Sequence, residues 1–119
     1  MAVQYQAKHR RDCAQAITDL GNRIGLYSGS TRVGTVYTDT TWGAAVDGSG
    51  PDAGYAVVTG SKVTIDVPAS TVSDNTTIDR YGIFNGSTLL RTNDMPVSLV
   101  VNDGSKSFQV DVTPEFKYR

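Results

Sequence analysis

The chain has 119 residues, of which 39% are hydrophobic, and a formal net charge of -1. This length fits one domain with a modest core, and the single cysteine, Cys13, excludes both an intrachain disulfide and a thiolate metal cage. The sequence has no apolar run of about 20 residues and no secretory leader at its start, so we expect no membrane contact and synthesis in the cytoplasm.

In this sequence, the periodicity of an α-helix is found in the opening segment. Its apolar residues recur at spacings of four, three and four: Cys13, Ile17, Leu20 and Ile24. Gly21 is a candidate stop at the C-terminal end of the helix. The spacing predicts a helix from Val3 or Gln4 to Asp19.

Strand and turn patterns follow. Residues 22–28 predict a first strand with Ile24 and Leu26 on one face, and residues 31–42 are rich in Thr, Val and Tyr, which favour a second strand. Residues 43–54 contain four glycines and a proline, which is typical of a loop.

Residues 55–67 are interpreted as a hairpin around Thr59-Gly60-Ser61. Its second arm places apolar residues inward at every other position: Val63, Ile65 and Val67. Pro68 should end this arm, because proline cannot donate to a strand ladder.

Two further hairpins are predicted. Asn85-Gly86 is a strong turn signal, and Tyr81 and Ile83 before it should lie on one sheet face, with Gly82 and Phe84 on the other. One of these faces is expected to be core and the other a contact face. The last hairpin turns at Asn102-Asp103-Gly104 and opposes two apolar sets: Val97, Leu99 and Val101 against Phe108, Val110 and Val112.

Short strands with turns about every ten residues indicate a mainly β protein. We predict an antiparallel β-sandwich or barrel-like domain with one N-terminal α-helix. Residues 1–21 would form the helix, a possible anchor, and residues 22–119 the sandwich.

The residues give little support to catalysis. The single histidine, His9, is interpreted as a solvated surface residue, and Cys13 as a small core residue. The chain has eleven Asp and one Glu, and most of the Asp residues lie at turns, where carboxylates cap backbone amides. Asp47 and Asp52 resemble a calcium loop only in part, since the closing Glu is missing. We therefore predict no enzyme, no catalytic residues, no metal and no cofactor.

The run Lys8, Arg10 and Arg11 is the candidate partner-binding site, since clustered cations can meet phosphates or an acidic protein surface. The alternative is an ordinary solvated helix face. With Asp12 beside it, the run does not favour a nucleic-acid partner. The aromatic residues fit either core or interface roles: Tyr27, Tyr37, Trp42 and Tyr55.

Four segments, in this order, carry a resemblance: LGNRIGLYSG, TTWGAA, VTIDVPAST and IDRYGIFNGSTLL. Together they resemble small virion proteins of actinobacterial phages, which are labelled tail-fibre-like or decoration proteins. The similarity covers most of residues 20–92 and consists of strand and turn patterns, so it implies a structural role and no catalytic residues.

The resemblance implies a bacteriophage structural protein located in the virion. The first hypothesis is a capsid decoration protein, that is, a minor capsid or cementing protein, which binds the major capsid protein or other virion proteins as a homo-oligomer, with a trimer favoured. The alternative is a tail-fibre or minor tail protein whose loop at residues 47–55 contacts the host cell envelope. A hydrolase is a third class, for which the sequence supplies no catalytic set.

Overall fold

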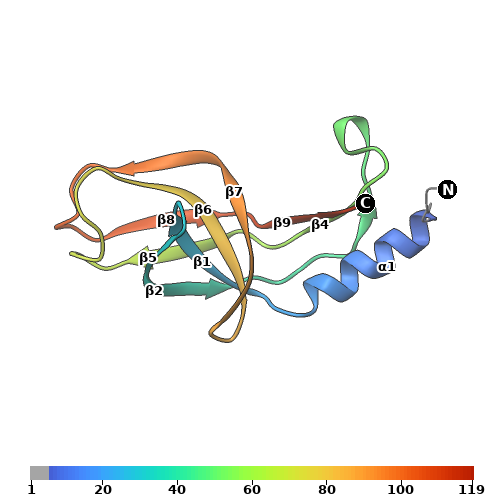
Figure 1. Ribbon diagram of the computed structural model, residues 1–119, viewed down its shortest axis with the longest axis horizontal. Helices are drawn as coiled ribbons and strands as arrows, with labels where there is room; N and C mark the ends of the chain where they lie inside the picture. Colours follow the sequence, from blue (N-terminus) through green and yellow to red (C-terminus); the bar gives the residue numbers. More distant parts are fainter. Residues whose placement is uncertain (1–5) are drawn as a thin grey trace.

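The structure, a computed structural model, describes residues 6–119. It is mainly β, with one α-helix near the N-terminus and antiparallel strand pairs, and this confirms the predicted fold class (Figure 1). The elements are α1 (Ala7–Thr18), β1 (Arg23–Ser28), β2 (Thr31–Asp39), β3 (Val46–Asp47), the 3-10 helix η1 (Gly50–Asp52), β4 (Ala56–Thr59), β5 (Val63–Val67), β6 (Thr76–Asn85), β7 (Thr88–Val101), β8 (Phe108–Val112) and β9 (Glu115–Tyr118).

The first layer is a four-stranded sheet in the order β2-β1-β6-β7. At its centre Ile24 lies opposite Ile83, and Leu26 lies opposite Tyr81. All four side chains are buried, so the predicted face of the first strand is confirmed. The β6–β7 hairpin is confirmed too, because Asn85 pairs with Thr88 across a turn in which Gly86 has a φ of 59°.

The second layer is a long ribbon with two arms. Residues 56–67 form one arm, whose strands β4 and β5 pair with β9 and β8 of the other arm. The hairpin predicted around Thr59-Gly60-Ser61 is therefore wrong, because the chain bends there without reversing. The Gly60 amide donates to the Pro114 carbonyl at 2.8 Å, and a Cβ on Gly60 would lie 2.6 Å from Thr40 Oγ1. This glycine is needed for a close approach of chains.

The inward alternation of the second arm is confirmed. Val63, Ile65 and Val67 are buried, and β5 ends directly before Pro68. These side chains pack with Ile24, Leu26, Ile78 and Ile83 of the first layer in one apolar cluster. Burial of this cluster between the two layers supplies the main hydrophobic stabilisation of the fold.

The predicted hairpin around Asn102-Asp103-Gly104 is also wrong. β7 pairs with β6, and β8 pairs with β5, so the two strands belong to different layers. Gly104 lies where the chain passes from one layer to the other. Its amide donates to Asp74 Oδ1 at 2.7 Å, and a Cβ would lie 2.1 Å from the Val72 carbonyl oxygen. Tertiary contacts, and not a local turn, place this glycine.

The helix is shorter than predicted. Gln6 is extended and occupies the N-cap position of a helix that begins at Ala7, and the earlier part of the predicted helix lies outside the described residues. It ends at Thr18, before Gly21. Gly21 is needed for a close approach of chains and not as a helix stop, since a Cβ there would lie 2.4 Å from the Phe84 carbonyl oxygen.

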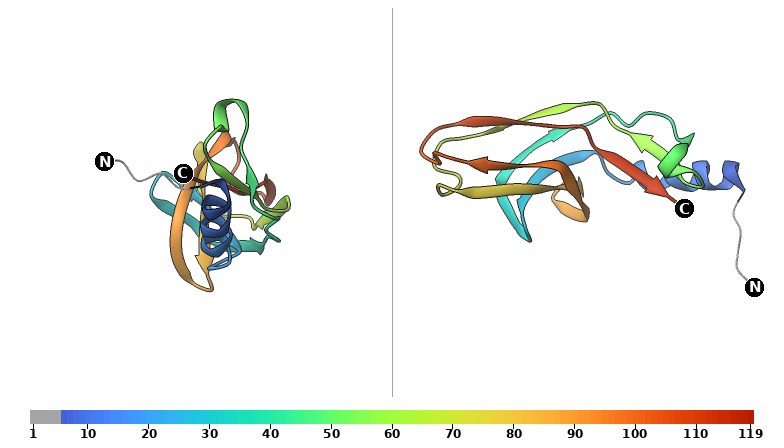
Figure 2. Two further views of the ribbon diagram at one scale, coloured as in Figure 1. Left: turned by 90° about the vertical axis from the view of Figure 1, so that its right-hand side faces the viewer. Right: turned by 90° about the horizontal axis from the view of Figure 1, so that it is seen from above.

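Helix α1 packs on the end of the second layer (Figure 2). Ala14 is fully buried against Ala56 and Val58 of β4, with Phe116 and Tyr118 of β9 nearby. Because each of these contacts lies within the same chain, α1 covers a second, smaller core.

Both faces of β6 are buried near its end. Tyr81 and Ile83 face the main core, as predicted. Phe84 on the opposite face is only 2% exposed, because Tyr27 stacks on it at 6.3 Å between ring centroids and the Arg32 guanidinium lies 4.3 Å from its centroid. The expected contact face is therefore closed here by the chain's own side chains.

Candidate functional site

The two layers are joined on one side and open on the other. On the joined side β2 contacts β5, and Thr38 Oγ1 donates to the Thr64 carbonyl at 3.1 Å. On the other side no strand ladder connects β7 with β8 or β9 within residues 6–119. This opening follows the long axis of a molecule that measures 53 × 27 × 24 Å.

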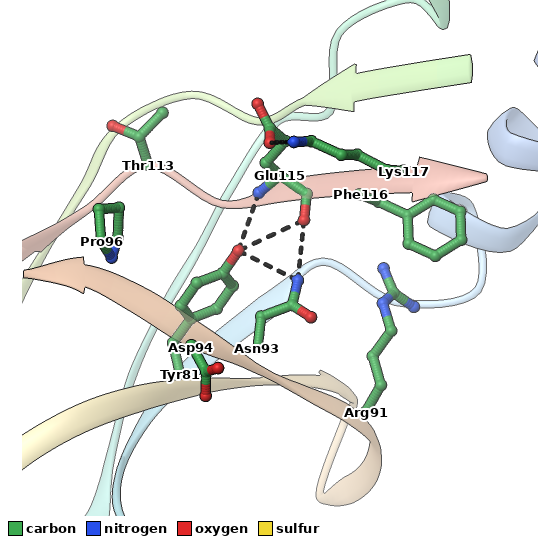
Figure 3. Close-up of a pocket in the computed structure, with 9 residues that line it drawn as sticks. All are labelled: Tyr81, Arg91, Asn93, Asp94, Pro96, Thr113, Glu115, Phe116 and Lys117. Carbon is green, nitrogen blue, oxygen red and sulfur yellow. Dashed lines mark hydrogen bonds and ion pairs between the residues drawn. The ribbon is translucent and has the colours of Figure 1, made fainter. Parts of the chain in front are cut away.

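Three hollows lie along the opening, and we call them together the β7 groove. The first, about 300 Å³, lies between residues 99–103 and residues 106–109. The second, about 260 Å³, lies between residues 95–97 and residues 111–113. The third, about 590 Å³, is lined by Tyr81, Arg91, Asn93, Asp94, Pro96, Thr113, Glu115, Phe116 and Lys117 (Figure 3).

Strand β7 presents apolar side chains to solvent. Val97 is 78% exposed and Val100 is 51% exposed, and three leucines of the strand are also exposed: Leu89, Leu90 and Leu99. The sequence analysis grouped Val97 and Leu99 with Val101 as one apolar set, and of these three only Val101 is buried. The β6–β7 register shifts between Ile78 and Arg80, and Val97 lies in the part of β7 that has no partner in β6, whereas Leu99 lies opposite the buried Ile78.

Such an edge is unusual for a protein that acts alone. Soluble proteins blunt long apolar edge strands with charges, prolines or bulges, because an open edge invites pairing with another chain. β7 has Pro96 and a bulge at its middle, yet its last five residues, 97–101, contain no charged residue. The β7 groove is therefore the best candidate for an interaction surface in this structure.

A polar network fixes the wall of the largest hollow (Figure 3). The Tyr81 hydroxyl accepts a hydrogen bond from the Glu115 amide at 3.0 Å and donates to the Glu115 carbonyl at 3.3 Å. Asn93 Nδ2 donates to the same carbonyl at 2.9 Å and to the hydroxyl at 3.2 Å. This network ties β6 and β7 of the first layer to β9 of the second.

We expect Tyr81→Phe to lower the free energy of unfolding by about 1–2 kcal/mol, because the Glu115 amide and the Asn93 amide then lose a partner in a half-buried position. Urea denaturation would measure the change. Tyr37→Phe is the matched control, because Tyr37 is 48% exposed and its ring stacks under Arg23. The free energy of unfolding of this variant should be almost unchanged. Equal losses in both variants would contradict the role of the network.

The predicted basic run is placed on α1, and much of its charge is used within the chain. Lys8 pairs with Asp12 at 2.6 Å, and Arg11 Nη1 donates to both carboxylate oxygens of Asp47 at 2.8 Å. The Lys8 hydrogen bond lowers the pKa of Asp12. Arg10 is partly buried on the same helix. The run thus attaches α1 to β3 through Arg11, and its role toward a partner stays a prediction.

The remaining candidates do not form a reactive centre. His9 Nε2 lies 3.5 Å from Cys13 Sγ, so the structure brings this pair together. Asp47 and Asp52 are engaged separately, with Arg11 and with Lys117 at 2.8 Å, and the Asp52 hydrogen bond raises the pKa of Lys117. Residues 6–119 contain no group of three or more His, Cys, Asp or Glu side chains that could hold a metal ion.

The sequence analysis did not single out Arg91 or Asn93, although both line the largest hollow. The sequence around a single arginine in a strand does not show whether it lines a binding site, since that depends on which strands lie opposite it. The aromatic residues divide as follows: Tyr27 is buried, Trp42 Nε1 donates to the Gly21 carbonyl at 2.9 Å, and Tyr37 is exposed.

No match is found when the chain is compared with protein-family models, with curated proteins and with solved structures. Within the described part of the chain, no helix is long and apolar enough to cross a membrane.

Proposed function

We propose that the protein is a structural component of a bacteriophage particle, and specifically a capsid decoration protein that binds the head surface as a homo-oligomer. The observation that carries this proposal is the row of exposed apolar side chains on the open edge strand β7. Exposed apolar surface on a soluble chain marks a contact with another macromolecule. The resemblance of the strand pattern to small phage virion proteins supports the kind of partner.

The proposed partners are further copies of the chain and the major capsid protein. In a closed trimer every copy buries the same two surfaces, so the apolar row on β7 of one copy would pack against a different surface of its neighbour. A trimer fits the three-fold positions of an icosahedral head. The proposal assigns no catalytic step, and no residue is given a catalytic role.

The number of copies per purified particle tests the proposal. Hundreds of copies, measured by quantitative mass spectrometry, would support a decoration protein. A dozen or fewer copies at the tail would favour instead a tail-fibre or minor tail protein, and absence from purified particles would end both versions.

A pair of lysines on β7 tests the surface itself. Val97→Lys with Val100→Lys should reduce incorporation into particles by at least about tenfold, because an interface that loses about 1.4 kcal/mol weakens tenfold. Both side chains are exposed, so the variant should fold normally. The matched control is Thr31→Lys with Thr35→Lys, at exposed positions of the opposite edge strand β2. Normal incorporation of the β7 variant would exclude β7 as the contact.

A further inference from the structure

Arg91 differs from the other charged residues that line the largest hollow. Asp94 is paired with Arg80 at 2.9 Å, and Glu115 is paired with Lys117 at 3.4 Å. Arg91 is half-buried, and its Nε and Nη2 atoms are closed off from solvent without a hydrogen-bond partner among residues 6–119. Among residues 6–119, it is the one charged side chain of this hollow that has neither an ion-pair nor a hydrogen-bond partner.

Ring contacts explain how the guanidinium is held, and they leave its donors unused. The Arg91 Cζ atom lies 4.7 Å from the centroid of the Phe116 ring and 6.0 Å from that of Trp42. A cation over an aromatic ring interacts through the face of the guanidinium, whereas the N–H groups point outward in its plane. The rings therefore contact the guanidinium and do not replace hydrogen bonds.

The two partnerless nitrogens also define a geometry. Nε and Nη2 lie on the same side of the guanidinium, and this edge grips the two oxygens of a carboxylate in parallel hydrogen bonds. From this arrangement we infer that Arg91, held by Phe116 and Trp42, binds a carboxylate group supplied by another molecule. Arg91 lines the hollow, and the inference requires its side chain to rotate so that this edge, which is closed off from solvent in the structure, faces the hollow.

The charges around the hollow select the class of anion. Asp94 and Glu115 line the same space beside Lys117, and the two carboxylates disfavour a doubly charged phosphate more than a singly charged carboxylate. Burial lowers the pKa of Arg91, since a half-buried cation without a counter-ion is costly. An incoming carboxylate removes that cost. This inference is independent of the virion proposal, because it concerns only the ligand chemistry of the hollow.

The experiment uses acetate as the probe and follows the side-chain Nε–Hε signals of arginine by NMR at constant ionic strength. The Arg91 signal should shift and saturate with a dissociation constant on the order of 10 mM, because so small a ligand makes few contacts. The Arg80 signal is the internal control, since that Nε already donates to Asp94. Equal, unsaturated shifts of both signals, or tighter binding of phosphate, would overturn the inference.

Two variants separate binding from structure. Arg91→Lys keeps the charge and loses the two-pronged edge, so acetate should no longer raise the melting temperature. Arg91→Met removes a partnerless buried donor, so its melting temperature without acetate should equal or exceed that of the unmodified protein. A fall of more than about 5 °C in Arg91→Met, with no acetate effect on the unmodified protein, would make Arg91 a packing residue only.

Sedimentation equilibrium then identifies the source of the carboxylate. If it is an acidic side chain of a second copy, both acetate and Arg91→Lys should weaken self-association severalfold. If it is a free small carboxylate, acetate should bind while self-association stays unchanged. Either result is read together with the NMR titration, and the carboxylate site fails if that titration shows no saturable shift at Arg91.

Discussion

Ala14→Lys should lower the free energy of unfolding by about 3–5 kcal/mol, a large part of the total stability of a domain of this size. Ala14 is fully buried between α1 and β4, so a lysine there must either bury its charge without a partner or push the helix off the sheet. Urea denaturation followed by the fluorescence of Trp42, which packs against the same small core, would report the change.

The matched control is Ala16→Lys, two residues along the same helix at an exposed position. Lysine is almost as good a helix former as alanine, so this variant should lose no more than about 0.3 kcal/mol. The comparison decides whether α1 belongs to the folded domain or is a separable anchor. If Ala14→Lys remains as stable as the control yet fails to join particles, the helix is an anchor.

Gly104→Ala should cost about 3 kcal/mol, at the upper end for added volume in a packed site. The new methyl group would lie 2.1 Å from the Val72 carbonyl oxygen, and the backbone on both sides is held by hydrogen bonds, from the Gly104 amide to Asp74 and from the Ser70 amide to the Gly104 carbonyl. Neither segment can move away without breaking one of them. Thermal unfolding would measure the loss.

Gly29→Ala is the control for this substitution. Gly29 has a φ of 59° and no atom within 4 Å of a built Cβ, so the variant carries only the strain of a left-handed alanine, about 1 kcal/mol. If the two variants lose the same stability, close packing at Gly104 is not what the fold requires there.

The local features of the fold could be predicted from sequence, because they depend on neighbouring residues. Alternation placed Val63 and Ile65 inward, Pro68 ended its strand, and Asn85-Gly86 closed a hairpin. Each of these signals acts over two to six residues, within reach of the backbone rules for strands and turns.

Strand partners could not be predicted in the same way. Gly60 and Gly104 each lie beside polar residues between two apolar runs, which is the pattern of a hairpin turn, and both are needed instead because another segment approaches closely. A glycine required for a turn and one required for a close approach are alike in sequence. The four strands around them therefore received the wrong partners.

The candidate surface could not be predicted from sequence, for a related reason. Val97 and Leu99 alternate as core residues do, and only the structure shows that both side chains are exposed on the edge strand β7. Arg91 needed Phe116 and Trp42, which lie 25 and 49 positions away in the chain, to become a candidate site. Contacts between residues so far apart in the chain produce no periodic pattern in the sequence.

The contact between α1 and β9 joins the first and the last elements of the described chain. During translation, the helix emerges from the ribosome long before the strand that covers it. The small core at this end can close only once β9 has been synthesised, so the apolar face of the helix stays uncovered until then. Contacts between segments so far apart in sequence form late in folding, and the apolar surface that they cover is exposed to aggregation in the interval.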